Sequence, residues 1–100
     1  MVYQLSAGML DACVLSVLEK EDAYGYILTQ NIKNVVDISE SSLYPILRRL
    51  QSDGCLITYD QPFAGRNRRY YRITELGTKR LDYLRKGWDE YKTCIDKVIY

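Results

Sequence analysis

The chain has 100 residues, of which 47% are hydrophobic and 27% are charged, a composition typical of one globular domain and not of a disordered segment. Its formal net charge is only +1 and it contains no histidine, so the commonest general base is missing and enzymatic chemistry has few candidates. No apolar run approaches the length of a membrane span and no signal peptide is recognisable, so we expect a cytoplasmic protein that does not enter a membrane.

Two helices are predicted in the first third of the chain. Apolar residues at positions 10, 13, 14, 17 and 18 follow the spacing of one helix face and predict a helix over about 7 to 20. After the charged turn KEDAYG, a second helix is predicted from about Tyr24 to Val35. We expect its buried face to consist of five apolar side chains, namely Tyr24, Ile27, Leu28, Ile32 and Val35.

The stretch SSLYPILRRLQSDG, residues 41 to 54, predicts a third, amphipathic helix that stops at Gly54. Its N-cap is Ser39, or Ser41 or Ser42 if the helix starts later. Pro45 costs no hydrogen bond if the helix begins at Ser42, but it removes one if the helix begins at Ser39. The buried stripe is predicted to be Leu43, Ile46, Leu47 and Leu50. The outward side chains are predicted to be Ser41, Ser42, Tyr44, Pro45, Arg48 and Arg49.

A β-hairpin with a basic second strand follows. CLITYD and RRYYRIT are rich in β-branched and aromatic residues, and the Pro- and Gly-containing segment QPFAGRN joins them. Alternation predicts that Cys55, Ile57 and Tyr59 share one face of the first strand, and that Tyr71 and Ile73 share one face of the second. We expect these two faces to pack on the helices.

The positive charge is concentrated in one segment. From Arg48 to Arg72 six arginines stand against two aspartates, whereas the rest of the chain has eight basic and eleven acidic residues. One basic segment on an otherwise acidic body suits an oriented contact with phosphates.

The last helix is predicted to begin after Thr74, which is a good N-cap. Its apolar residues are spaced alternately by three and four positions, as on an a/d heptad seam: Leu81, Leu84, Trp88, Tyr91, Ile95 and Val98. We expect this seam to form the interface of a homodimer, because a 100-residue chain has little other core to cover it. Packing of the helix on the chain's own first helix is the alternative.

Three helices followed by a hairpin predict a mainly α fold with a small β-hairpin wing, a winged helix-turn-helix whose third helix enters the major groove of double-stranded DNA. We expect residues 1–74 to form the DNA-binding part and residues 75–100 the dimerisation helix, within one compact unit. The alternative from another class is a winged-helix protein-interaction module without DNA binding, which would have no need for arginines along both the third helix and the hairpin.

The cysteines, Cys13, Cys55 and Cys94, are odd in number and far apart in sequence, so they suggest neither a disulfide framework nor a metal site. We interpret them as small buried hydrophobic residues, and a thiol-based sensor remains the alternative.

Three sequence blocks resemble the signatures of PadR-like transcriptional regulators: YGYILTQNI at 24 to 32, SSLYPILRRLQSDGCLI at 41 to 57 and GRNRRYYRITELG at 65 to 77. The single terminal helix is similar to that of the short subfamily. The resemblance implies a homodimeric winged-helix repressor on an operator with inverted half-sites. It assigns Ser41, Ser42, Tyr44 and Arg48 to the recognition helix and Gly65, Arg66, Arg68 and Arg69 to the wing, and Arg49 joins them on charge.

The same resemblance implies an effector site. Trp88 resembles a tryptophan that, in multidrug-sensing members, lines a pore at the dimer centre and stacks on flat aromatic compounds. Plain interface packing of Trp88 is an equal alternative. The neighbours expected in such a pore are Leu84, Tyr91, Asp11 and Ala12, and the nearby Lys92 argues against a preference for cationic compounds. No cofactor and no metal are expected.

Overall fold

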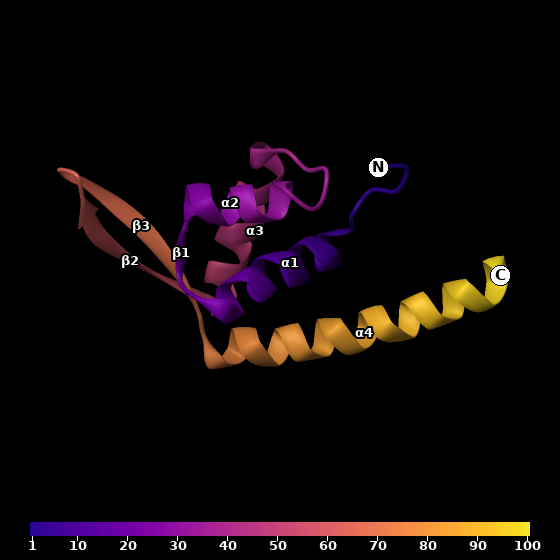
Figure 1. Cartoon of the computed structure of the whole chain (residues 1–100). Coiled ribbons are helices and arrows are strands. Elements are labelled where there is room, and N and C mark those ends of the chain that lie inside the picture. The colour runs from indigo at the N-terminus through magenta and orange to yellow at the C-terminus, as the bar shows by residue number, and fades with distance from the viewer.

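The computed structural model describes all residues from Met1 to Tyr100 (Figure 1). In chain order its elements are α1 (Ala7–Lys20), β1 (Ala23–Tyr24), α2 (Gly25–Lys33), α3 (Glu40–Ser52), β2 (Leu56–Phe63), β3 (Arg66–Ile73) and α4 (Glu75–Ile99). This order confirms the predicted mainly α fold with a β-hairpin wing, to which the structure adds a short third strand. No helix has the length and apolar character that crossing a membrane requires.

The first helix has the predicted bounds, and the second is shorter than predicted. The Ser6 side chain caps α1 by accepting a hydrogen bond of 3.2 Å from the backbone N–H of Met9. In place of the expected start of α2, Ala23 and Tyr24 form β1. Leu28 and Ile32 of α2 are buried as predicted.

Three other members of the predicted buried face of α2 lie elsewhere. Tyr24 is only half-buried and packs in the sheet, Ile27 is exposed, and Val35 lies beyond the end of the helix with 79% of its surface exposed. The predicted helix therefore runs past both ends of α2, which has nine residues.

The third helix begins after Ser39, and its predicted apolar stripe of Leu43, Ile46, Leu47 and Leu50 is fully within the core. Pro45 thus lies in the sixth position of α3, where its missing N–H leaves the Ser41 carbonyl without a donor in the helix. The first turn is tightened, since the Ser42 N–H donates to the Ser39 carbonyl three residues back. The proline therefore costs one backbone hydrogen bond at the exposed end of this helix.

The sheet has the strand order β1-β3-β2, with both pairings antiparallel. Leu56 pairs with Ile73 and Thr58 with Tyr71, so these four side chains share the face that packs on the helices. The predicted face of the second strand is confirmed, but that of the first is wrong: Ile57 and Tyr59 point the other way. Cys55 is buried because it precedes the strand, where Gly54 at φ +80° redirects the chain after α3.

The terminal helix is capped by Thr74 as predicted. Its hydroxyl accepts from the Gly77 N–H at 3.1 Å and donates to the Gly54 carbonyl at 2.6 Å, so one side chain joins the end of α3 to the start of α4. The first turns of α4 pack on α1, and the helix then continues well beyond the body of the protein (Figure 1). The division at residue 74 stays a prediction.

Candidate nucleic-acid interface

The exposed N-terminal turns of α3 carry hydroxyl groups. The Ser39 hydroxyl lies 3.0 Å from that of Ser41 and 2.9 Å from that of Ser42, so three hydroxyls gather at the first turn of the helix, where the N–H groups of Glu40 and Ser41 have no helical partner. Tyr44 is 49% exposed, and Arg48 is exposed and forms no ion pair within the chain. A helix end with free donors, a favourable dipole and an unpaired guanidinium group is suited to phosphate oxygens.

Arg49 differs from its neighbour Arg48. Its guanidinium group donates to the buried carboxylate of Asp11 in α1 and lies 3.8 Å from the carboxylate of Asp53. The hydrogen bond from Arg49 to Asp11 raises the pKa of the guanidinium group further above its usual value. Both predicted site residues are therefore paired with each other in the chain: Arg49 is bonded to a carboxylate of the core, and one carboxylate oxygen of Asp11 is occupied by Arg49.

The wing is formed by β2, β3 and the turn of Ala64 and Gly65, which adopt φ values of +50° and +79°. Alternation along β3 places Arg66, Arg68, Tyr70 and Arg72 on the face turned away from the core. Arg69 lies on the other face, 3.8 Å from the carboxylate of Asp60. The predicted wing arginines are thus divided between two faces.

The base of the wing is joined to the turn between α1 and α2 through Asp22. The Tyr59 hydroxyl donates to the Asp22 carboxylate at 2.5 Å, and the Arg72 Nε donates to the same oxygen at 3.0 Å. These bonds, that from Tyr59 foremost, hold the pKa of Asp22 below its usual value. Arg72 therefore has a structural role, since its Nε and one terminal nitrogen are held by Asp22.

Arg68 is held by aromatic rings. Its guanidinium carbon lies 3.5 Å from the centre of the Phe63 ring and 4.3 Å from that of Tyr24. The guanidinium group forms no hydrogen bond and no ion pair within the chain. Phe63 was not predicted as a site residue, because the sequence pattern placed it in the connecting turn. In the hairpin Phe63 pairs with Arg66, which lies two residues from Arg68 on the same face, and this pairing follows from the strand register.

The predicted seam of α4 is divided between the core and the solvent. Leu81 is fully buried in its own chain, which removes it from the predicted dimer interface, and Leu84 is half-buried against the same core. The remaining members are exposed, from 40% for Ile95 to 81% for Val98. Trp88 and Tyr91 stack on each other, with ring centres 6.2 Å apart and planes 24° apart.

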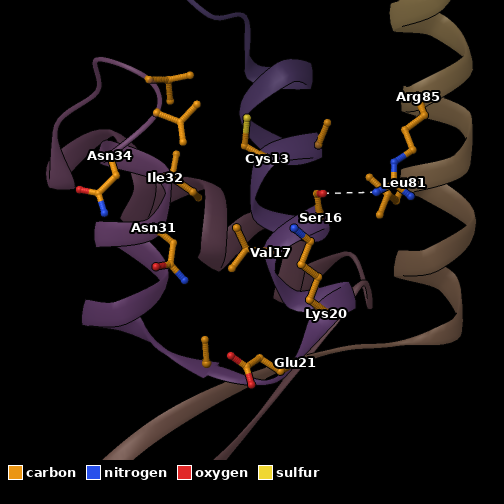
Figure 2. Close-up of a pocket in the computed structure, with 14 residues that line it drawn as sticks. Cys13, Ser16, Val17, Lys20, Glu21, Asn31, Ile32, Asn34, Leu81 and Arg85 are labelled. Atoms are coloured by element: carbon orange, nitrogen blue, oxygen red, sulfur yellow. Dashed lines mark hydrogen bonds between the residues drawn. The ribbon is translucent and has the colours of Figure 1, made fainter.

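A groove of about 640 Å³ lies between α1, the end of α2 and α4 (Figure 2). Arg85 of α4 reaches across to α1, where its side chain donates to the Ser16 hydroxyl at 3.3 Å and to the Glu19 carboxylate at 3.1 Å. Of the residues predicted for an effector, only Ala12 lines this groove. Leu84, Trp88 and Tyr91 lie apart from it along α4, so a single chain does not bring the predicted effector residues together.

The three cysteines lie in different environments. Cys55 is buried as predicted, Cys13 is half-buried in the wall of the groove, and Cys94 is exposed on α4, contrary to the prediction. Burial raises the pKa of the Cys13 and Cys55 thiols, which disfavours the reactive thiolate form. This weakens the thiol-sensor alternative for these two residues.

Three helices and a hairpin wing, with free arginines on the third helix and on the outer face of the wing, define a winged helix-turn-helix regulator that binds DNA. The sequence matches the transcriptional regulator PadR-like family over residues 14–83, and this chain belongs to that family. It is therefore a DNA-binding transcriptional regulator and not an enzyme.

Relatives agree with this assignment. A crystal structure of a Streptococcus mutans protein superposes with a TM-score of 0.90 at 44% identity, over 99% of this chain and 93% of the other. A PadR family transcription regulator from Clostridium difficile superposes with a TM-score of 0.84 at 26% identity, over 91% and 98%. A transcriptional regulator of Mycobacterium tuberculosis is 36% identical over 70 residues, which are 69% of this chain and 65% of the relative.

Proposed function

We propose that the protein is a sequence-specific, homodimeric repressor whose operator is an inverted repeat and whose binding is relieved by a flat aromatic effector. The DNA-binding surface is inferred from which arginines are paired with carboxylates and which are not. Arg48, Arg66 and Arg68 form no ion pair, whereas Arg49 and Arg72 are engaged by aspartates that fix the scaffold. Free guanidinium groups are thus left on the two elements that a winged helix presents to DNA.

Each DNA-binding element has a distinct task in this proposal. Ser41, Ser42, Tyr44 and Arg48 of α3 contact the major groove and its phosphates, and set the register. Gly65 lets the wing turn approach the duplex, and Arg66, Arg68 and Arg69 contact the DNA beside it, with Arg66 neutralising phosphates. Contacts with several phosphates make the affinity fall steeply as salt increases.

The dimer is proposed on the exposed part of the α4 seam. Leu84, Trp88, Tyr91, Ile95 and Val98 follow heptad spacing on one side of a helix that projects beyond the body of the protein (Figure 1). A twofold pair joined there would present two copies of α3, separated by about one turn of duplex, roughly 10 bp, to inverted half-sites.

Repression and its relief are proposed from the family resemblance and from α4. Occupying an operator that overlaps a promoter suffices to block transcription. The stacked pair of Trp88 and Tyr91 offers aromatic faces within the proposed interface, and a flat compound bound between two such helices would act if it favours one spacing of the two wings over another.

Selection of bound sites from genomic DNA fragments tests this proposal. We expect inverted repeats to be enriched, a gel shift with the enriched duplex, and no comparable shift with a scrambled duplex of the same length. Absence of any DNA preference would instead favour the protein-interaction module.

The effector is tested separately by titrating the dimer with planar aromatic compounds while the fluorescence of Trp88, the only tryptophan of the chain, is followed. We expect quenching together with release of the operator. Quenching that leaves operator affinity unchanged would contradict relief by the effector.

A further inference from the structure

The outer face of β3 carries three arginines in three different states. Arg72 lies over the Tyr59 ring, and its Nε and one terminal nitrogen are held by Asp22. Arg66, near the tip, has neither an aromatic nor an acidic partner. Arg68, between them, lies over two rings while all of its N–H donors remain free of protein partners.

The two rings approach Arg68 from opposite sides of the central strand. Phe63 belongs to β2 and Tyr24 to β1, and β3 runs between these strands. Tyr24 is itself fixed, since its ring packs 5.7 Å from that of Tyr70, which stacks on Tyr59 at 5.5 Å. The guanidinium group of Arg68 is therefore restricted in position, although it is bound to no anion.

Such restriction affects recognition. A long side chain that is free in solution loses rotamer entropy when it binds, and it can follow phosphates on any sequence. A guanidinium group that is already held presents its planar set of donors in one place, where acceptors in one arrangement satisfy it and others do not.

We propose that Phe63 and Tyr24 are positioning residues that hold Arg68 as a specificity determinant of the wing, distinct from the sequence-independent attraction supplied by Arg66. The inference rests on the proposed function, because it requires an operator that the protein prefers. It adds a residue outside the three signature blocks, Phe63, to the determinants of operator choice.

Phe63 provides the cleaner test, because it is 54% exposed at the wing tip, whereas Tyr24 also packs on Tyr70. Phe63→Leu removes the ring and keeps an apolar side chain, and Phe63→Tyr keeps the ring. Affinities of full-length variants for the selected operator and for a scrambled duplex of equal length are measured by fluorescence anisotropy at several salt concentrations.

We expect Phe63→Leu to weaken operator binding about tenfold, to change binding of the scrambled duplex less than about twofold, and to leave the salt dependence as it is. Phe63→Tyr should match the wild type. Arg66→Ala is the matched control: it should weaken both duplexes and reduce the slope of log affinity against log salt by about one.

The decisive measurement uses the Arg68→Ala background. There Phe63→Leu should have no further effect on operator binding, because the ring acts only through Arg68. Equal losses on both duplexes, no loss on either, or an undiminished loss in the Arg68→Ala background would overturn the inference. Failure of the wild type to prefer any duplex would instead reject the proposed function.

Discussion

Arg48 and Arg49 are adjacent in the sequence but serve different ends. Arg48 is exposed and unpaired, whereas Arg49 is bonded to the carboxylate of Asp11, which is only 6% exposed. A buried carboxylate that loses its partner is destabilising, because its desolvation is no longer offset. The same residue type thus supports ligand binding at one position and the fold at the next.

This contrast gives a prediction for the two alanine variants. Arg49→Ala should lower the free energy of unfolding by about 2 kcal/mol, since it leaves the Asp11 carboxylate unpaired. Arg48→Ala should change it by less than about 0.5 kcal/mol and should reduce the preference for the operator. Urea unfolding and anisotropy titrations measure the two effects.

A double variant supplies the control. Arg49→Ala combined with Asp11→Ala should recover part of the lost stability, because no charge is then left without a partner. Equal stability of Arg48→Ala and Arg49→Ala would contradict a structural role of Arg49.

The helix α3, which carries both arginines, shows which features could be predicted from the sequence and which could not. The stripe from Leu43 to Leu50 was predictable, because helical periodicity is a relation between neighbours three or four positions apart. The N-cap was left open between three serines, of which the structure uses Ser39. The bond from Arg49 to Asp11 joins residues 38 positions apart, and the bond from Tyr59 to Asp22 joins residues 37 apart. No local pattern encodes such pairs, so the state of each arginine could not be predicted from the sequence.

At the scale of elements, the wing is anchored at its base. Asp22 accepts from Tyr59 and Arg72, and so ties both long strands to the turn after α1. The sequence assigned the side chains of β2 to the wrong faces. Which residues of a strand face the core depends on where the preceding turn ends, and Cys55 belongs to that turn. The residues were identifiable as strand formers, but the face to which each side chain points depended on a shift of one residue in the start of the strand.

The anchor makes a prediction for stability against pH. Because the folded-state pKa of Asp22 is lowered, its stabilisation is fully present above the unfolded value of about 3.9 and is lost as the pH falls through the lower folded value. The difference in unfolding free energy between the wild type and Asp22→Asn should therefore be constant from about pH 6 to 8 and should shrink below about pH 4. Urea unfolding at a series of pH values measures it.

Asp60→Asn is the matched control, since it removes a carboxylate of the same hairpin whose only ion pair, with Arg69, is exposed and 3.8 Å long. It should show little difference at any pH. A pH-independent effect of Asp22→Asn would mean that the carboxylate charge is not what anchors the wing.

The start of α4 is constrained by close packing. Gly77 is buried, and a Cβ there would overlap the Cys55 carbonyl and approach the Ile73 Cγ1 to 2.7 Å. Gly87, in the same helix, has no atom within 4 Å of such a Cβ. Alanine favours a helix over glycine by about 1 kcal/mol, so the two substitutions separate packing from propensity.

We expect Gly77→Ala to lower the unfolding free energy by about 1 to 3 kcal/mol despite its better propensity, because the overlapping atom belongs to the backbone. Gly87→Ala should raise it by about 0.5 to 1 kcal/mol. Thermal melts followed by circular dichroism compare them, and a stabilising Gly77→Ala would show that the junction of α3, β3 and α4 can relax.

At the scale of the whole molecule, the long terminal helix leaves apolar surface uncovered. Trp88, Tyr91, Ile95 and Val98 are exposed on one side of α4, beyond the part that packs on α1. The extents of the chain, 55 × 28 × 21 Å, reflect this projecting helix (Figure 1). Sequence periodicity predicted the seam, but it could not show that Leu81 is covered by the chain's own core while Ile95 is not.

The proposed dimer links this helix to DNA binding, which gives the last prediction. Ile95→Glu places a charge in the seam, and Thr93→Glu places the same charge on the opposite side of the same helix turn, so the pair separates loss of the interface from a change of net charge. Sedimentation should show monomers for Ile95→Glu and dimers for Thr93→Glu. Because two linked half-site contacts bind about 10² to 10⁴ times more tightly than one, Ile95→Glu should reduce operator affinity by at least about a hundredfold, while the affinity of a single half-site changes little. A monomer that still binds the full operator tightly would show that recognition does not depend on the twofold pair.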